Sequence, residues 1–322
     1  MNIKHLFAFL LLSIAPLHAA DISKYNVMWD SPSKDSLDSM PLSGRLGAGA
    51  NVWVEAGSIW IYPSHNGAYD EVGRLLKLGC IRVTPVDFKL GEAGFRQELV
   101  LANGSIKIEQ GDFKASLWFA GETLVLESSS GKPLAYDVAY GTWRDRKRDG
   151  ILVDVFSGPR QSFTQDQVHP SKEVFVWFHR NADYPVDLAE KAKKQGISPE
   201  LVRDLTTKRV FGGAAVVEGG VSEPVPADVE WQFWNGKAWT GRTPARENLV
   251  IAVRLGGKLD ADPQQWEAEA KALLDPTALQ AAKADEAKRW QTRVAQSHSR
   301  VPCERHRELA RKGNALCAAD AG

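Results

Sequence analysis

The chain has 322 residues, of which 43% are hydrophobic and 25% are charged, a composition typical of globular proteins and unlike that of disordered chains. Forty basic residues balance forty acidic ones, so the net charge gives no reason to expect nucleic acid or an anionic membrane as a partner. The three cysteines are too few, and odd in number, for a disulfide framework.

The N-terminus has the three parts of a secretory signal peptide. Lys4 provides the positive charge, an apolar run follows at residues 6–15, and Ala19 and Ala20 provide small residues for cleavage. The apolar run is about half of the ~20 residues that a membrane span needs. We therefore expect residues 1–20 to be removed and the mature protein to be exported to the periplasm or the medium, without membrane contact after cleavage.

The middle of the chain, from about residue 51 to residue 255, is predicted to form an antiparallel β-structure. Alternating segments at 51–55 and 58–62 flank Ala56-Gly57, which predicts a tight hairpin. Asn103-Gly104 predicts a type I′ turn in the meander that follows. The other predicted strands are 95–101, 105–109, 113–119, 123–128, 134–140, 151–156, 173–179, 213–218, 229–234 and 248–255. Short strands at this spacing predict a large antiparallel sheet or sandwich.

Eleven tryptophans are a high count for this length. Asn235-Gly236 predicts a further hairpin between Trp234 and Trp239. Core packing is the default role of most of these indole rings, whereas one or two exposed rings would form a platform for a carbohydrate.

The region after residue 258 changes to helical character. Asp262-Pro263 and Asp275-Pro276 each combine an N-cap residue with proline at the first helical position, which predicts helices near 263–274 and 276–296. Two shorter helices are predicted at 186–195 and from Ser198. The last segment, 297–322, lacks aromatic residues, and we expect a poorly ordered tail or the product of a truncated or frameshifted gene.

The loop after the second strand of the first hairpin is the first candidate site. His65, Asn66, Tyr69 and Asp70 place an imidazole, an amide, a phenol and a carboxylate close together. Such groups can pair with sugar hydroxyls, and an aromatic ring can stack on the flat face of a sugar. The same residue types also favour turns, so a purely structural loop is the alternative.

A second candidate site follows a later strand. Trp143, Arg144 and Asp145 combine an aromatic ring with charged groups that could contact a saccharide. A solvated loop of alternating charge is the alternative interpretation, and we favour it. Asp145 and Asp149 could be imagined as a catalytic carboxylate pair, but spacing within a loop does not fix the distance that glycoside hydrolysis requires. We expect these carboxylates, and the Asp70 carboxylate, to lie in polar surroundings without burial.

Other reactive residues are predicted to be structural. Cys80 lies in an apolar strand and is expected to be a buried, inert thiol. His169 and His179 stand alone in the sequence and are expected to have structural hydrogen bonds. The chain lacks the short motifs for zinc, nucleotide binding and serine hydrolysis, so we assign no metal and no cofactor.

The N-terminal part of the mature chain resembles a known family. The start Trp29-Asp30-Ser31-Pro32, the turn Met40-Pro41-Leu42 and the glycine-rich segment 44–49 resemble a bacterial family of unknown function numbered 5703, over about residues 25–290. That family is similar to the N-terminal β-supersandwich of inverting α-L-fucosidase-like glycoside hydrolases of family ninety-five. The resemblance implies a large exported protein with a β-domain, helical linkers and then an (α/α)6 barrel.

The resemblance implies no catalytic residue in this chain, because the catalytic carboxylates of the related hydrolases lie in the barrel. Gly44-Arg45-Leu46-Gly47 also lacks the asparagine of the Gly-Asn-Gly segment in fucosidase-like proteins. Any substrate contact made by that asparagine is therefore not carried over.

These observations together predict a mainly β fold, a large antiparallel β-supersandwich at residues 21–258 with a short helical C-terminal linker at 259–296. The expected function is that of a non-catalytic β-domain of an exported carbohydrate-active enzyme. A freestanding carbohydrate-binding module and an inert structural domain are the alternatives. A carbohydrate is the candidate partner, and no partner protein is identified.

Overall fold

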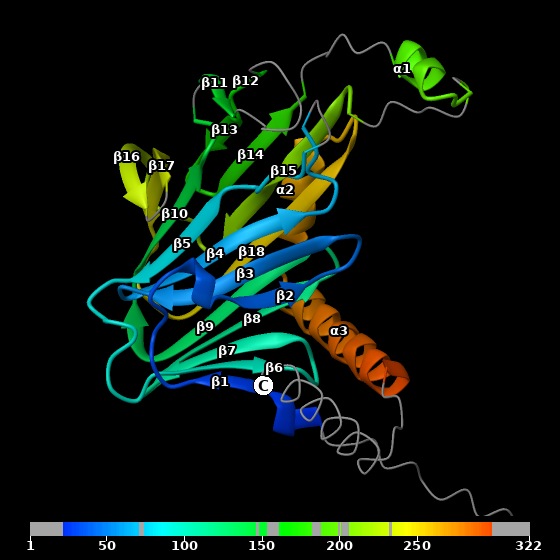
Figure 1. Ribbon diagram of the computed structural model, residues 1–322. Coiled ribbons are helices and arrows are strands. Elements are labelled where there is room, and N and C mark those ends of the chain that lie inside the picture. The colour runs from blue at the N-terminus through cyan, green and yellow to red at the C-terminus, as the bar shows by residue number, and fades with distance from the viewer. Residues whose placement is uncertain are drawn as a thin grey trace, which may run out of the picture.

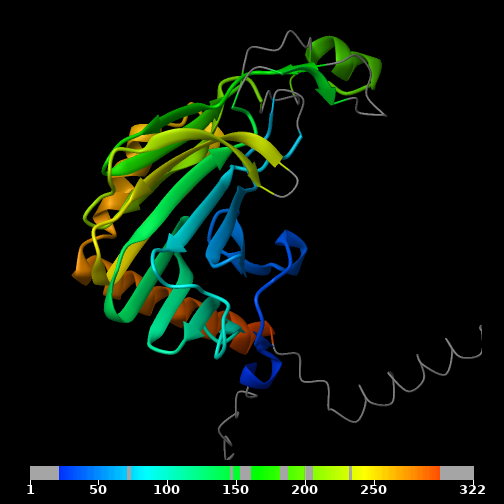
Figure 2. The ribbon, with the colours of Figure 1, turned by 90° about the vertical axis from the view of Figure 1, so that its left-hand side faces the viewer.

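The computed structural model describes residues 22–70, 74–145, 148–152, 161–181, 188–198, 200, 206–231 and 234–297. Two antiparallel sheets pack face to face, and two C-terminal helices lie against the outer face of the larger sheet (Figures 1 and 2). The mainly β sandwich with a short helical C-terminal segment is thus confirmed. The predicted signal peptide and the predicted tail lie outside the described residues.

The larger sheet has nine strands in the order β1-β6-β7-β8-β9-β18-β15-β14-β13. Its strands are β1 (Val27–Trp29), β6 (Arg96–Val100), β7 (Ser105–Gln110), β8 (Phe113–Ala120), β9 (Thr123–Leu134), β18 (Arg246–Leu259), β15 (Arg209–Val217), β14 (Val174–Arg180) and β13 (Gln167–Pro170). The run from β6 to β9 is a meander of sequential hairpins, as the spacing of turns predicted.

The smaller sheet has seven strands in the order β16-β17-β10-β5-β4-β3-β2. Its strands are β16 (Val225–Trp231), β17 (Trp234–Arg242), β10 (Tyr136–Thr142), β5 (Cys80–Pro85), β4 (Ser58–His65), β3 (Ala48–Glu55) and β2 (Met40–Ser43). A separate pair joins β11 (Arg148–Leu152) to β12 (Gln161–Phe163). The predicted hairpin at Ala56-Gly57 is confirmed, because both residues have positive φ and Glu55 pairs with Ser58.

The main core lies between the two sheets. Every second residue of a strand faces inward, so Val52 and Ile61 pair on the inner face of the smaller sheet and Leu117 and Leu126 pair on that of the larger sheet. All four side chains are buried almost completely. Burial of such a side chain contributes roughly 1.5–3 kcal/mol to the stability of the fold.

The helices are α1 (Leu188–Lys194), α2 (Pro263–Ala272) and α3 (Pro276–Ser297), with short 3₁₀ turns at Ile22–Tyr25 and Ser36–Asp38. Both aspartate N-caps are confirmed: the Asp262 side chain accepts the amide of Gln264 at 3.0 Å, and that of Asp275 accepts the amide of Ala278 at 2.9 Å. On α2, Trp266 is buried against the larger sheet, and on α3 Leu279 packs in the same way. The predicted helix from Ser198 lies largely outside the described residues.

Two turn predictions are wrong. Val100 pairs with Ser105, and in the loop between them only Gly104 has a positive φ, 62°, whereas a type I′ turn needs two such residues. The β17 strand runs straight through Asn235-Gly236, and Trp231 pairs with Trp234. Trp231 is buried in an aromatic cluster on the outer face of the smaller sheet, so packing sets the register there against the local turn preference.

Candidate functional site

The loop after β4 is anchored to the larger sheet through His65. The ring nitrogen Nδ1 of His65 accepts the amide of Gly67 at 2.9 Å, so Nε2 carries the hydrogen and donates it to Oε1 of Glu122 at 2.9 Å. A Cβ on Gly67 would lie 2.0 Å from the carbonyl oxygen of Gly257 on β18. The loop backbone therefore lies against β18, and only glycine fits at this point of contact.

A chain of ion pairs continues from His65 to helix α2. Glu122 lies at the turn before β9 and accepts Nη2 of Arg254 at 2.8 Å through Oε2. The Nε of the same arginine donates to Glu269 of α2. His65, Glu122 and Arg254 are mostly buried, with side-chain exposures of 5%, 16% and 14%. One arginine thus holds two carboxylates from separate elements. Through these contacts, the series of ion pairs joins both sheets to helix α2.

These residues form the wall of a pocket of about 310 Å³. Asn66, Lys258 and Gln265 add an amide, an ammonium group and a second amide to the lining. Leu46 is 76% exposed at the rim of this pocket and has a left-handed φ of 51°. The volume lies near the lower end of the range for small-molecule sites. The pocket combines hydrogen-bond donors, acceptors and an apolar rim, which are the groups that a saccharide can use.

Asp70 and Tyr69 take different positions on the same loop. Asp70 is buried completely, which corrects the prediction of polar, exposed surroundings. Its carboxylate accepts the amide of Arg74 at 2.8 Å and the Nε of Arg74 at 2.7 Å, so it closes its own loop. The Tyr69 side chain is 37% exposed, and the guanidinium carbon of Arg209 lies 5.9 Å from its ring centre. Of the two, only Tyr69 can contact a ligand.

In the second candidate loop, the described charged residues Arg144 and Asp145 are not solvated. Arg144 and Asp145 are each only 9% exposed, so the predicted lack of burial is wrong there too. Arg144 donates through Nε to Oδ1 of Asp166 at 2.7 Å. Residues 146–147 and the side chain of Asp149 lie outside the described part of the chain, so the imagined carboxylate pair has no described geometry.

Asp166 is the centre of a buried polar network that sequence reasoning missed. It accepts Nδ1 of His179 at 2.9 Å and the hydroxyl group of Thr142, besides the Arg144 guanidinium. Burial raises the pKa of Asp166, but the Arg144 charge and the hydrogen bonds from His179 and Thr142 outweigh it and hold that pKa below its usual value. His179 is therefore a structural histidine as expected, although it does not stand alone. Asp166 stays ionised and serves as an internal counter-ion.

The outer face of the smaller sheet carries an aromatic cluster. Tyr62 and Trp143 meet edge to face at 5.3 Å between ring centres, and the Lys77 ammonium lies 5.6 Å from the Trp143 ring. Trp60 and Trp231 form a second edge-to-face pair at 5.2 Å. Every tryptophan whose side chain is described is buried or half-buried, so none is the fully exposed platform that sequence reasoning considered. Trp143 lies here, away from the pocket at His65.

The structure thus brings His65 and Asn66 into one pocket, whereas the other predicted site residues do not line it. Glu122, Arg254, Lys258 and Glu269 are the lining residues that sequence reasoning missed. The Gly121-Glu122 pair carries only a turn signal, and the partners of Glu122 are far away in the sequence.

Two other features are absent from the described ranges. The described residues contain no cluster of three or more His, Cys, Asp or Glu side chains that could hold a metal ion. Among the helices described, none has the length and apolar character required to span a membrane.

Comparison with solved structures found a protein described as "Putative kojibiose phosphorylase from human microbiome". The two chains share 10% sequence identity with a TM-score of 0.38, and the match covers 84% of this chain and 37% of that one. This chain therefore spans well under half the length of that protein. No curated protein is significantly similar to the chain. The family model "Domain of unknown function (DUF5703)" matches residues 28–298, and the chain belongs to this family.

Proposed function

We propose that this chain is the non-catalytic β-domain of an exported carbohydrate-active protein, and that the pocket at His65 contacts the hydroxyl groups of a saccharide. The observation that carries the proposal is the composition of the pocket wall. It offers the Asn66 amide, the Lys258 ammonium group and the Glu122 carboxylate beside the exposed apolar side chain of Leu46. Hydroxyl groups both donate and accept hydrogen bonds, so they can pair with each of the polar groups.

The non-catalytic part of the proposal rests on the state of the carboxylates. Glycoside hydrolysis requires one carboxyl group that carries a proton and a second that acts as base or nucleophile. Glu122 and Glu269 share the Arg254 guanidinium, and Asp70 is held by Arg74. Each of these carboxylates is thus held by an arginine side chain of the fold. Such contacts suit the carboxylates to positioning and hydrogen bonding better than to attack on a bound sugar.

Calorimetric titration with neutral mono- and oligosaccharides tests the binding. Asn66→Ala and Lys258→Ala should each weaken the association about tenfold, the equivalent of one lost hydrogen bond to a charged or well-placed group. Lys237→Ala, on an exposed position of β17, is the matched control and should bind as the wild type does. If no saccharide binds, the inert structural domain is the better description. If the pocket variants bind as the wild type does, the saccharide does not contact this pocket.

Turnover of a panel of aryl glycosides tests the absence of catalysis. The wild type should not hydrolyse the glycosides faster than buffer without protein does. Turnover that Glu122→Gln or Glu269→Gln abolishes would contradict the proposal and would make the pocket an active site.

Export is the third part of the proposal, and it is supported by the order of charge, apolar run and small residues at the N-terminus. N-terminal sequencing of protein from the periplasm or medium should begin at Ala20 or Asp21. A cytoplasmic product that still begins at Met1 would contradict export.

A further inference from the structure

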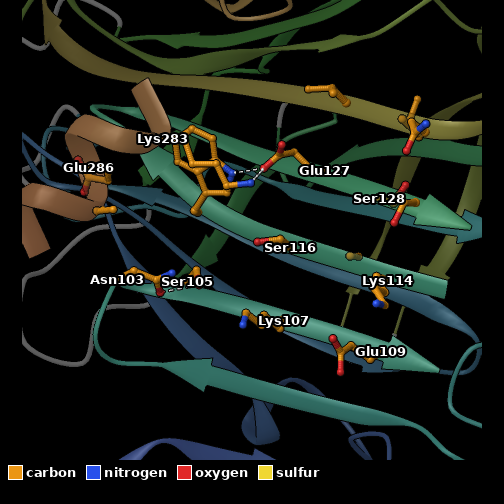
Figure 3. A pocket seen from close by; sticks show the side chains of 17 residues that line it. Asn103, Ser105, Lys107, Glu109, Lys114, Ser116, Glu127, Ser128, Lys283 and Glu286 are labelled. Carbon is orange, nitrogen blue, oxygen red and sulfur yellow. Dashed lines mark hydrogen bonds and ion pairs between the residues drawn. The ribbon is translucent and has the colours of Figure 1, made fainter. Parts of the chain in front are cut away.

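A second concave surface lies on the outer face of the nine-stranded sheet, on the side covered by α3. Strands β7, β8 and β9 form its floor, and Lys283, Glu286 and Ala287 of α3 form one wall (Figure 3). Its volume is about 450 Å³, and it shares no lining residue with the pocket at His65. We call this surface the α3 groove.

The floor of the α3 groove alternates in charge and hydrogen-bonding type. Across the strands, Glu109 is opposite Lys114, and Lys107 is opposite Ser116. Ser116 is in turn opposite Glu127 on β9. Side chains that are directly opposite each other in antiparallel strands lie roughly 4.5–5.5 Å apart at Cβ. The floor is therefore a grid of ammonium, carboxylate and hydroxyl groups with no excess of one charge.

Several of these groups have no protein partner. Glu127 is occupied, because it accepts the Trp118 indole at 2.7 Å and the Lys283 ammonium at 2.6 Å (Figure 3). Lys107 lies opposite Glu98 on β6 and interacts with it electrostatically. In the described part of the chain, the side chains of Glu109, Lys114 and Ser116 make no hydrogen bond or ion pair. The middle of the floor thus presents unpaired donors and acceptors to the solvent in the groove.

We propose that the α3 groove binds a neutral saccharide chain. A hydroxyl group can donate to Glu109 and accept from Lys107 or Lys114, so an array of hydroxyl groups can match the whole grid. A polyanion would meet the Glu109 and Glu127 carboxylates, and a polycation would meet the lysines, so a uniform charge is disfavoured. Trp118 is buried beneath the α3 contact, so binding depends on hydrogen bonds more than on ring stacking.

The shape of the groove favours an oligosaccharide over a single sugar. The polar rows cross β7, β8 and β9, and α3 closes only one side of the groove. A longer oligosaccharide can contact more of these polar side chains, because α3 closes only one side of the groove. Binding should therefore strengthen with the number of sugar units.

The experiment is a titration of the full mature chain with neutral gluco- and manno-oligosaccharides of increasing length, in parallel with oligogalacturonates of the same lengths. Ser116→Trp fills the centre of the floor and should weaken neutral oligosaccharide binding by about tenfold or more. Lys237→Trp places the same bulk on an exposed position of the other sheet and should bind as the wild type does. The double variant Glu109→Gln/Lys114→Gln removes one charge of each sign without adding bulk and should also weaken binding, which separates an effect on the grid from the effect of a bulky side chain.

Asn66→Ala separates this inference from the pocket at His65, because that variant alters only the pocket and should bind oligosaccharides at the groove unchanged. Loss of binding in Asn66→Ala with full binding in Ser116→Trp would place the saccharide in the pocket and overturn the groove. Tighter, salt-sensitive binding of the oligogalacturonates would overturn the neutral ligand class. No binding of any neutral oligosaccharide to the wild type would overturn the inference as a whole.

Discussion

Gly47 and Asn66 lie so close together that a Cβ on Gly47 would be 1.9 Å from Cγ of Asn66. The backbone N–H of Asn66 also donates to the carbonyl oxygen of Gly47 at 2.9 Å. Gly47 has a φ of 89°, a conformation that side-chain-bearing residues rarely adopt. The glycine-rich turn before β3 therefore holds a pocket residue in position, and this turn is part of the segment that resembles the family.

Gly47→Ala should destabilise the protein through both backbone strain and the contact with Asn66. Gly111→Ala is the matched control, because Gly111 also has a positive φ, 58°, but an added Cβ there would meet no atom within 4 Å. We expect a loss of about 1 kcal/mol for Gly111→Ala from φ strain and of about 3 kcal/mol for Gly47→Ala. The free energy of unfolding in urea measures both. Equal losses would show that Asn66 moves aside without cost.

Asp166→Asn should be among the most destabilising single changes of a polar residue. The substitution keeps the volume but leaves the Arg144 guanidinium without a counter-charge in a buried position, at a cost of about 3–5 kcal/mol. Asp137→Asn is the control, since Asp137 pairs with Arg242 at the surface through two hydrogen bonds and the loss of that ion pair should cost far less. If the two variants unfold at the same urea concentration, Asp166 is not the counter-ion that its geometry indicates.

The same network predicts a pH dependence. Because the pKa of Asp166 is lower in the folded protein than the ordinary value of about 3.9, its contribution to stability is present above that value and is lost as the pH falls through the folded pKa. Asn cannot titrate, so the difference in unfolding free energy between wild type and Asp166→Asn should narrow below about pH 4. Urea unfolding over a series of pH values measures this difference. A gap that stays constant or widens in acid would contradict the prediction.

The sequence predicted those elements whose signals are local. Ala56-Gly57 lies between two alternating strands, and Asp262-Pro263 carries both helix-start signals, so each was placed correctly. Asn235-Gly236 carries an equally strong local turn signal, yet both residues lie within strand β17 and pair with β16. This register pairs Trp231 with Trp234, and Trp231 is buried in it. Where a local turn preference conflicts with the burial of a large aromatic side chain, the local signal alone gives the wrong answer.

The candidate site was less predictable for a similar reason. The loop with His65 could be identified from its residue types, but Glu122 and Arg254 come from distant strands and carry no local signal of their own. Asp145 was expected in solvent because its neighbours are charged, and the structure buries it. Burial of a charge depends on a partner that can come from a distant part of the chain, and sequence spacing does not show that partner.

Cys80 should not react as a nucleophile in the folded protein. Burial raises the pKa of its thiol well above the usual range, and this effect outweighs the charges of Arg82 and Lys77. We expect no alkylation of Cys80 by iodoacetamide at mildly alkaline pH, and complete alkylation after unfolding in guanidinium chloride. Peptide mapping by mass spectrometry reports Cys80 separately from the other two cysteines. Rapid labelling of Cys80 in the native protein would contradict its burial.

Arg254→Met tests whether one guanidinium group holds the pocket together. The variant keeps an apolar stem on β18 but leaves Glu122 and Glu269 without their shared cation. Because both ion pairs are partly exposed, we expect a loss of about 1–3 kcal/mol at neutral pH, less than for a fully buried pair. Arg246→Met is the control on the same strand, since its ion pair with Glu218 is longer, at 3.6 Å, and more exposed.

A second background distinguishes lost charge compensation from lost packing in Arg254→Met. In a Glu122→Gln/Glu269→Gln protein no carboxylate depends on Arg254, so adding Arg254→Met there should cost less than it does in the wild type. A packing defect would cost the same in both backgrounds. Urea unfolding of the four variants, with Arg246→Met beside them, gives the comparison. Equal costs in the two backgrounds would mean that Arg254 supports the pocket through its aliphatic stem and not through its charge.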